Sequence, residues 1–258
     1  MITSSQNPRL KWIRQLQDSN RERRQAGAFV IEGVRLVEEA LKRGWPACLV
    51  LYSDEINERG RSVVQGFQQQ GVETYEVASA VLRSASDTGT PQGLLAVLQA
   101  HTLPVPSTLD FVFIPDSVRD PGNLGTMLRT AAATGVQAVW IPPGTVDPYS
   151  PKVLRSAMGA HFCLPVIVHE WISLRELVQR HSLYCFLADS EAASVYTGVN
   201  FRRPVVVIVG GEAEGASQEA RMLASETVQI PMSGQVESLN AAVAAAVLFY
   251  EVVRQRSQ

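Results

Sequence analysis

The hydrophobic positions along the chain form short runs typical of strands, separated by longer amphipathic stretches typical of helices. In the N-terminal part, the runs at 29–31, 49–52, 73–77 and 94–99 predict strands, and residues 34–42 and 63–70 predict helices. Asn7 and Pro8 predict an earlier helix start, with Asn7 as the N-cap and Pro8 at the first helical position. Alternating elements of this kind indicate a small α/β unit.

A second set of strand-like runs begins after residues 99–110, which contain Pro104 and Pro106 and predict a linker. The runs lie at 111–114, 137–141, 164–168, 184–188, 205–209 and 227–230, with helical patterns between most of them. Strands that alternate with helices in this way are typical of a parallel sheet covered by helices. We therefore expect an α/β chain with domains at 1–98 and 111–258.

The composition favours a soluble globular protein. The chain has 258 residues and is 46% hydrophobic, which is enough for a real core and excludes a disordered class. Its longest apolar run, 241–250, is about half of what a membrane span requires, and the N-terminus shows no apolar signal segment. The three cysteines and four histidines lack the spacing of a disulfide framework or a metal site. We expect a cytoplasmic protein without a metal.

Charge is uneven along the chain. Residues 1–24 carry six basic groups against two acidic ones, in a chain whose formal net charge is −2. A basic N-terminal arm on an acidic body suggests an anionic partner, and Trp12 among the arginines suits RNA contact by stacking. The alternatives are a solvated helix face and a core position for Trp12. The candidate RNA-binding residues are Arg9, Lys11, Arg14, Arg21, Arg23 and Arg24.

Three strand ends carry unusual residues, and open α/β sheets bind ligands beyond the carboxyl ends of their strands. After 111–114, Asn123 is a candidate N-cap of a helix in which Arg129 follows Gly125 by one turn. On that face, a residue without a side chain would let a phosphate come close to the guanidinium. The alternative is an exposed helix arginine beside a capping asparagine.

The second strand end, after 205–209, begins with Gly210, Gly211 and Glu212, and glycines there permit close approach of a ligand. No third glycine completes a GxGxxG fingerprint, and the chain has no GxxxxGK[ST] loop, so a nicotinamide enzyme or a P-loop enzyme is poorly supported. The third end, after 227–230, leads through Ser238, a candidate helix cap, to Asn240. The next helix is apolar on nearly every side, so Asn240 enters a buried structural or ligand-holding network.

Together the three segments resemble the ordered motifs of the SpoU (TrmH) family of RNA 2′-O-ribose methyltransferases. The matching positions are Asp120-Pro121-Gly122-Asn123-Leu124-Gly125 with Arg129, Gly210-x-Glu212-x-x-Gly215, and Ile230-Pro231-Met232 with Ser238-Leu239-Asn240. Residues 1–98 are similar to the ribosomal-protein-like α/β/α substrate-binding domain that many members carry. Two departures are Ala213, where members often have glycine, and Ala241, where valine is common.

This resemblance implies a SPOUT-like fold with a deep trefoil knot in the C-terminal part, S-adenosylmethionine as methyl donor, and a homodimer. The implied interface includes helix 239–255, with Phe249 and Tyr250 as candidate anchors. The implied substrate is structured RNA, with ribosomal RNA favoured over transfer RNA. Other readings are a tRNA methyltransferase, a non-catalytic RNA-binding protein of the same fold, and a Rossmann-type oxidoreductase.

The resemblance also implies the site residues. The catalytic set would be Arg129, Asn123, Glu212, Ser238 and Asn240, and the cofactor would contact Gly210, Gly211, Ile230, Met232, Ser238 and Leu239. A guanidinium has a pKa above ~12, so we expect Arg129 to stabilise a developing alkoxide rather than to act as a simple base. Asn123, Glu212, Ser238 and Asn240 would hold Arg129 and the cofactor in place.

Overall fold

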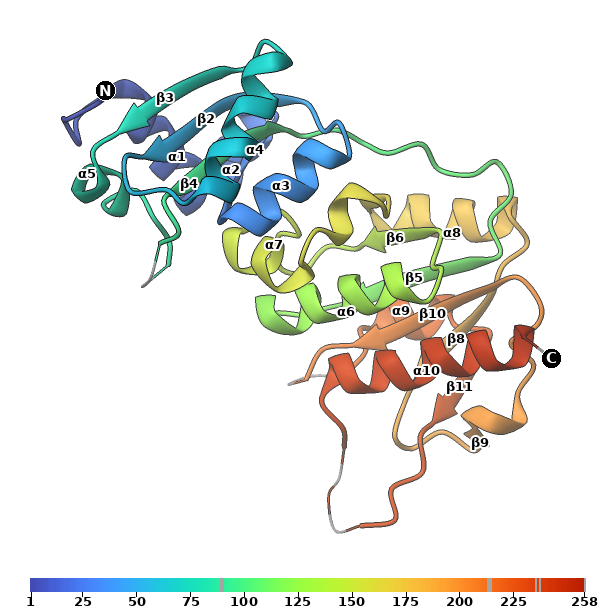
Figure 1. Ribbon diagram of the computed structural model, residues 1–258. Coiled ribbons are helices and arrows are strands. Elements are labelled where there is room, and N and C mark those ends of the chain that lie inside the picture. Colours follow the sequence, from blue (N-terminus) through green and yellow to red (C-terminus); the bar gives the residue numbers. More distant parts are fainter. Residues whose placement is uncertain (89–90, 213–214, 235, 237, 258) are drawn as a thin grey trace. The chain divides into compact units, whose positions relative to one another are not determined.

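The computed structural model describes residues 1–258 except 89–90, 213–214, 235, 237 and 258 (Figure 1). The chain divides into two compact units. Unit 1 contains Met1–His101 and Tyr149–Phe162, and unit 2 contains Thr102–Pro148 and Cys163–Gln258. The chain therefore passes between the units three times, and the first passage lies within the predicted linker.

Unit 1 is built on a four-stranded sheet in the order β1-β4-β2-β3, in which β4 is antiparallel to β1 and β2 while β3 is parallel to β2. The strands are β1 (Ala28–Glu32), β2 (Ala47–Ser53), β3 (Glu73–Val77) and β4 (Leu94–Gln99). The helices are α1 (Pro8–Asp18), α2 (Asn20–Ala26), α3 (Val34–Lys42), α4 (Glu58–Gln69), α5 (Ser79–Arg83), α7 (Pro151–Ala157) and the 3₁₀ turn η1 (Ala160–Phe162). The predicted strands of residues 29–99 and the helix at 34–42 are confirmed, while the helix predicted at 63–70 begins five residues earlier, at Glu58.

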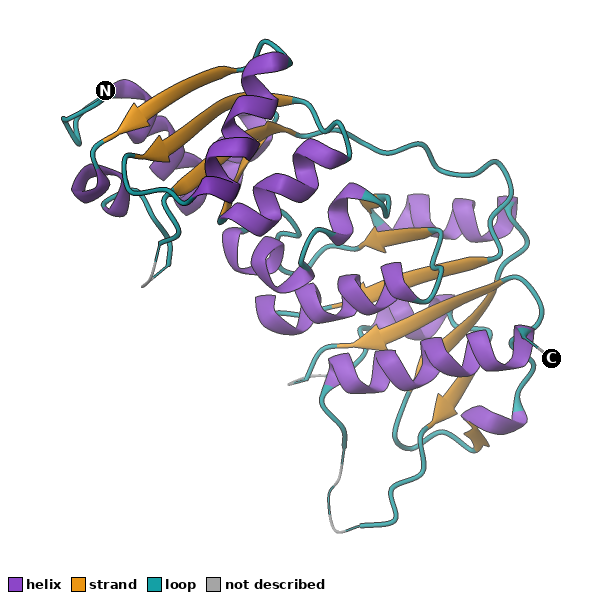
Figure 2. Cartoon of the chain, in the orientation of Figure 1, coloured by secondary structure: helices purple, strands orange, loops and turns teal. Residues whose placement is uncertain are grey.

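Helices cover both faces of the unit 1 sheet (Figure 2). Leu10, Ile13 and Leu16 of α1 are fully buried against alternate residues of β1, β2 and β4, while α3 and α4 pack on the other face. This is the expected α/β/α arrangement. Its first helix begins as predicted, because the Asn7 side chain accepts a hydrogen bond from the Arg9 amide at 3.0 Å.

The basic N-terminal segment is not a projecting arm, contrary to the prediction. Ile2 forms a parallel bridge with Val77, and its amide donates to the Glu76 carbonyl at 2.7 Å. Residues 8–26 then form α1 and α2, which pack on the sheet. The segment is held in unit 1 because its apolar positions contribute to the core.

Unit 2 contains a seven-stranded sheet in the order β7-β6-β5-β10-β8-β11-β9, and every strand pair in it is parallel. The strands are β5 (Phe111–Asp116), β6 (Ala138–Ile141), β7 (Val166–Val168), β8 (Tyr184–Ala188), β9 (Ser194–Val195), β10 (Val205–Gly210) and β11 (Glu226–Gln229). The helices are α6 (Pro121–Ala133), α8 (Trp171–Arg180), the 3₁₀ turn η2 (Tyr196–Gly198), α9 (Gln218–Leu223) and α10 (Ala241–Arg256).

Two layers of helices enclose this sheet, which confirms the predicted parallel architecture. In Figure 1, α6 and α10 lie on one face, and α8 and α9 lie on the other. Phe249 of α10 is fully buried and packs edge-on against Phe111 and Phe113, with ring centroids 5.9 and 4.8 Å away. The prediction that Phe249 anchors a dimer is therefore wrong, because it belongs to the chain's own core. Tyr250 and Val243 of α10 are 57% and 49% exposed.

Both helices that follow the predicted site loops begin at other residues than expected. Asp120, not Asn123, caps α6, and its carboxylate accepts from the Asn123 amide at 2.8 Å. Asn240, not Ser238, caps α10, and its Oδ1 accepts from the Ala242 amide at 2.9 Å. Aspartate and asparagine cap helices as well as serine does, and Pro121 fits the first turn after Asp120. The corrected starts leave the Asn123 side chain free for contacts outside its helix.

No helix in the part of the chain that the structure describes is long and apolar enough to cross a membrane.

Candidate active site

A cavity of about 410 Å³ opens in unit 2 where β8, β10 and β11 end and α10 begins. All six residues predicted to bind the cofactor line it: Gly210, Gly211, Ile230, Met232, Ser238 and Leu239. Glu212 and Ala241 line it as well. The three segments come together because parallel strands present their carboxyl ends at one edge of the sheet.

Two glycines at the end of β10 allow close backbone packing there. A Cβ on Gly211 would lie 2.2 Å from the Ser117 carbonyl oxygen, and a Cβ on Gly210 would lie 2.7 Å from the Ala216 nitrogen. Both obstacles are backbone atoms, which cannot move aside as a flexible side chain would. The wall of the cavity therefore requires glycine at both positions.

A buried carboxylate fastens the loop after β10 to the end of β5. Asp116 is fully buried, and its Oδ2 accepts from the Ser217 amide at 2.6 Å. Its Oδ1 accepts from the Ser117 hydroxyl at 3.1 Å. Our sequence analysis did not single out Asp116, although a carboxylate ending a buried parallel strand is a signal that could have found it.

Three of the predicted catalytic residues form one hydrogen-bonded chain across the three motifs. Asn240 Nδ2 donates to Asn123 Oδ1 at 3.1 Å, and Asn123 Nδ2 donates to the Glu212 carboxylate. The Asn240 oxygen is already used by the start of α10. The orientation of both amides is thus set by their partners, and the chain of donors ends on a negative charge.

Arg129 and Ser238 stand outside this chain. Arg129 is exposed on α6, and no hydrogen bond or ion pair joins its side chain to another residue that the structure describes. Ser238 lines the cavity without taking part in the network. The expected support of Arg129 by Asn123, Glu212, Ser238 and Asn240 is therefore not present in this structure. Ala213, the noted departure from the family motif, lies outside the described residues.

Further polar residues of the cavity were missed in the sequence. Asp189, Ser190 and Glu191 directly follow β8 and line the cavity, so the strand-end rule applied above could have found them. Burial raises the pKa of Asp189, but hydrogen bonds from the Glu191 amide and from Arg221 outweigh it and lower the pKa. The Arg221 guanidinium lies 2.6 Å from the Asp189 carboxylate. Asp189 is consequently ionised at neutral pH.

The six basic residues proposed for RNA contact have different surroundings in unit 1. Arg23 is only 7% exposed, and its guanidinium donates to the carbonyls of Leu16 and Gln17, where it holds the end of α1. Arg9 lies 4.0 Å above the Tyr75 ring, and Arg14 donates to the Leu10 carbonyl. These contacts argue against an RNA contact by Arg23. The exposed members are Lys11, Arg21 and Arg24.

Within the described residues, no group of three or more His, Cys, Asp or Glu side chains has an arrangement that could hold a metal ion.

Family models match both parts of the chain. A model described as the SpoU rRNA Methylase family matches residues 110–250, and a model of an MRM3-like substrate binding domain matches residues 7–96. The first match includes the segment Tyr149–Phe162, which packs in unit 1.

Individual relatives match almost end to end. A protein of Synechocystis sp. named as an uncharacterized tRNA/rRNA methyltransferase is 37% identical and covers 99% of this chain and 94% of its own. The 23S rRNA (guanosine(2553)-2′-O)-methyltransferase RlmP of Bacillus subtilis is 33% identical over 97% of this chain and 98% of its own. The crystal structure of the SpoU methyltransferase AviRb from Streptomyces viridochromogenes with AdoMet has a TM-score of 0.91 at 28% identity, over 98% of this chain and 99% of that one.

Proposed function

The chain belongs to the SpoU rRNA methylase family, and from this premise we propose that it methylates a ribose 2′-hydroxyl of ribosomal RNA with S-adenosylmethionine as the donor. The observation that carries the proposal is the hydrogen-bonded chain Asn240–Asn123–Glu212, which joins all three motifs next to the cavity. A Rossmann-type oxidoreductase has no support in this family.

The cavity fits the proposed cofactor in size and in chemistry. Its 410 Å³ lies in the range of small-molecule sites. Val228, Ile230 and Leu239 offer apolar contact for an adenine ring, while the carboxylates of Asp189 and Glu212 suit ribose hydroxyls and a cationic donor. S-adenosylmethionine supplies an activated methyl group, whose transfer forms the O–CH₃ bond and leaves the sulfur as a neutral thioether.

We assign Arg129 to the RNA rather than to the cofactor. It is exposed and does not line the cavity, so its guanidinium is available to a ribose or phosphate. A permanent positive charge there stabilises the alkoxide that develops as the 2′-hydroxyl loses its proton to phosphate or water. Asn123 and Asn240 act as positioning residues, because they fix Glu212 at the wall of the cavity.

Ribosomal RNA is the proposed target because the relatives that match over the whole chain include a 23S rRNA enzyme, and because residues 7–96 match an MRM3-like substrate binding domain. Lys11, Arg21 and Arg24 present exposed positive charge on that domain and are the proposed contacts from the N-terminal segment. By analogy with the bacterial 23S rRNA enzyme, the proposed location of this protein is the cytoplasm.

The decisive experiment maps 2′-O-methylation across ribosomal and transfer RNA from a strain lacking this protein and from the same strain with the gene restored. We expect one ribosomal position to lose its methyl group and to regain it on restoration. Purified protein should then methylate RNA of the deletion strain at the same position. Loss of a methyl group confined to transfer RNA would reject the ribosomal target.

We also propose that two copies associate through α10. Val243 and Tyr250 are exposed and lie seven residues apart, so they share one face of that helix. Sedimentation across a dilution series should show a dimer, and Tyr250→Glu should weaken it because the new charge would be buried. A wild type that is monomeric at micromolar concentration would reject the interface.

The trefoil knot expected for the family is part of the same proposal. The chain leaves β11, beyond β8, and then returns to pack α10 against β10 and α6 (Figure 1). Pulling the denatured chain by its ends tests the knot. A knotted chain should extend less than an open chain of 258 residues at ~3.4 Å each.

A further inference from the structure

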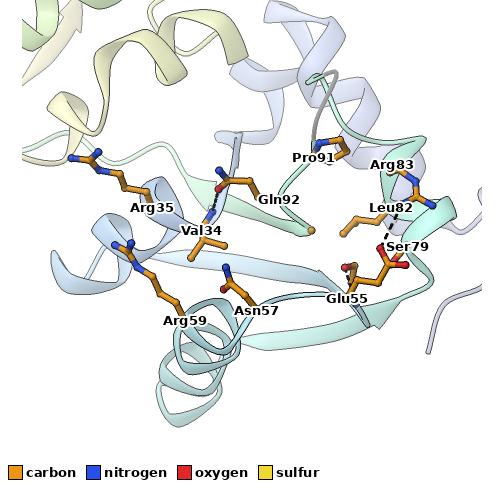
Figure 3. Close-up of a pocket in the computed structure, with 12 residues that line it drawn as sticks. Val34, Arg35, Glu55, Asn57, Arg59, Ser79, Leu82, Arg83, Pro91 and Gln92 are labelled. Carbon is orange, nitrogen blue, oxygen red and sulfur yellow. Dashed lines mark hydrogen bonds and ion pairs between the residues drawn. The ribbon is translucent and has the colours of Figure 1, made fainter.

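Unit 1 contains a second cavity, of about 520 Å³, that is larger than the one assigned to the cofactor. It lies where β2 ends, between the first residues of α3 and α4, and it is bounded by α5 and by residues 91–93 before β4 (Figure 3). Three arginines, Arg35, Arg59 and Arg83, line it against a single carboxylate, Glu55. The balance of charge in its wall is positive.

Two amide side chains add to this character, because each has its oxygen occupied. Gln92 Oε1 accepts from the Val34 amide at 2.9 Å, and Asn57 Oδ1 accepts from the Gly60 amide at 2.9 Å. Each side chain therefore caps a helix with its oxygen and has its NH₂ group as the remaining donor. Both residues are exposed on the cavity, so these NH₂ groups can meet a ligand.

Two glycines beside the cavity make this arrangement possible: Gly33, directly before α3, and Gly93, directly before β4. Gly33 has φ +98°, and a Cβ there would lie 3.1 Å from Gln92 Oε1. Gly93 has φ +72°, and a Cβ there would lie 2.6 Å from the Ser53 hydroxyl. Side chains at these positions would be strained and would press on the capping amide and on the cavity wall.

The charges are not evenly neutralised. Arg59 is paired with Glu38, and Arg83 lies 3.6 Å from Glu55 at the far end of the cavity from Arg35 (Figure 3). No carboxylate among the described residues lies within ion-pair distance of Arg35. Arg35, Arg59, Gln92 and Asn57 therefore gather nitrogen donors at one end, and the Arg83–Glu55 pair occupies the other.

We propose that this cavity binds a nucleotide of the RNA substrate, with its phosphodiester among Arg35, Arg59 and the NH₂ groups of Gln92 and Asn57. A wall of donors with excess positive charge suits phosphate oxygens. The volume suits one nucleotide. The inference rests on the proposed function. It adds an RNA-binding site in unit 1, formed by residues far in sequence from the methyl-transfer motifs.

Two substitutions replace an NH₂ donor in the cavity by a carboxylate oxygen and keep the helix caps. Gln92→Glu and Asn57→Asp keep an oxygen for the Val34 and Gly60 amides, and they replace the NH₂ donor by a negative charge. Arg35→Gln removes the unpaired cation. Gln69→Glu, at the other end of α4, makes the same chemical change away from the cavity. Arg180→Gln removes an exposed arginine from α8 and is the control for Arg35→Gln.

The assay measures binding of ribosomal RNA from the deletion strain over a range of salt, together with KM and kcat for methyl transfer. We expect Gln92→Glu and Asn57→Asp to weaken RNA binding at least tenfold and Arg35→Gln about threefold to tenfold. For each variant, the slope of log K against log salt should decrease in magnitude by ~0.7–0.9 for each phosphate contact that is removed. KM should rise, while kcat at saturating RNA and the affinity for S-adenosylmethionine stay within twofold. Gln69→Glu and Arg180→Gln should match the wild type.

Titrating the wild type with inorganic phosphate and with a nucleoside monophosphate separates the possible anions. Shifts in the side-chain NMR signals of Gln92 and Asn57 with the monophosphate, and competition with RNA, support the proposal. The proposal is overturned if the cavity variants bind RNA as tightly as an active wild type does. It is also overturned if inorganic phosphate binds in the cavity and RNA does not displace it. A wild type that methylates no RNA rejects the proposed function itself, before any cavity variant is compared.

Discussion

At the scale of single residues, the site depends on which atom of each amide faces which neighbour. The Asn240 oxygen caps α10, so its nitrogen donates to Asn123, and the nitrogen of Asn123 in turn donates to Glu212. Each bond determines the direction of the next one. A substitution of Asn123 therefore disturbs its hydrogen bonds with both Asn240 and Glu212.

Asn123→Asp is expected to break this chain, because two carboxylates would then face each other. Single-turnover methyl transfer should fall at least tenfold. The double variant Asn123→Asp with Glu212→Gln restores a donor opposite an acceptor and should recover part of the loss. We expect a coupling of about 1–3 kcal/mol between the two changes. If the effects of the two changes on the transfer rate were additive in a double-mutant cycle, this would contradict the hydrogen bond between Asn123 and Glu212.

Arg129→Ala is expected to lower the single-turnover rate by ~100- to 1000-fold, the usual cost of losing a group that stabilises an oxyanion. The side chain is exposed, so folding and S-adenosylmethionine affinity should stay unchanged. Thr126→Ala, an exposed position on the same helix, is the control. A rate within threefold of wild type for Arg129→Ala would remove this residue from the active site.

Gly211→Ala is expected to abolish detectable S-adenosylmethionine binding and to lower the melting temperature, since its Cβ would meet the Ser117 carbonyl at 2.2 Å. A Cβ on Gly198 would have no described atom within 4 Å, and Gly198 has no positive φ, so Gly198→Ala is the matched control. Calorimetry and thermal unfolding of both variants test the close packing of the cavity wall. Equal behaviour of the two would contradict it.

At the scale of elements, the sequence predicts most strands and helices, but it does not identify the residues that begin two of the site helices. The ranges 34–42, 73–77, 94–99 and 184–188 coincide with observed elements because apolar periodicity sets them. Asp120, Asn123, Ser238 and Asn240 can all cap a helix, so local propensity does not choose among them. The two-residue β9 is too short to have a period.

The last helix, α10, contains a buried carboxylate, Glu251, whose negative charge stabilises the helix through hydrogen bonds. Glu251 is 6% exposed and accepts hydrogen bonds from Arg254 at 2.7 and 2.8 Å and from Gln255 at 2.8 Å. The bonds from Arg254 lower the pKa of Glu251 most, against a smaller opposing effect of burial. Gln255 also accepts from the Phe201 amide at 2.9 Å, so the group ties α10 to the turn before β10.

Glu251→Gln is therefore expected to lower the free energy of unfolding at pH 7. A carboxylate with a lowered folded-state pKa stabilises the protein above its unfolded value, near 4.5, and loses this contribution as pH falls through the folded value. The difference between wild type and variant should shrink below about pH 4.5. Denaturant unfolding at several pH values measures it, with the exposed Glu176→Gln as control. A pH-independent difference would contradict the assignment.

At the scale of the whole molecule, the order of the motifs along the sequence does not show which unit each segment joins, because the chain passes between the two units three times. The strand-end rule correctly predicted that the loops after β10 and β11 would line the cavity, but the loop after β8, which lines it too, was missed. The hydrogen bonds between the amides, and the second cavity, were not predictable, because they join residues distant in sequence. The packing of Tyr149–Phe162 in unit 1 is of the same kind. There Tyr149 contacts Phe29, and Phe162 contacts Trp45, with ring centroids 5.0 and 5.1 Å apart.

A chain cut once in the linker should therefore stay in one piece. We expect a protease site inserted between Pro106 and Ser107, in an exposed stretch, to be cleaved readily. The two fragments should elute together under native conditions and separate only in denaturant, because α7 and η1 remain packed in unit 1. The uncut insertion variant is the control. Free N-terminal fragment under native conditions would contradict this packing.

The three passages of the chain also bear on how such enzymes can be recombined. A hybrid made by joining the first hundred or so residues of one relative to the remainder of another would bring a foreign helix to the surface that Phe29 and Trp45 offer. Exchanging the RNA specificity of two relatives therefore requires two grafts, the N-terminal segment and Tyr149–Phe162 together. Over evolutionary time, this mutual dependence would favour inheritance of both parts as one block, even though residues 1–101 contain all four strands of the unit 1 sheet.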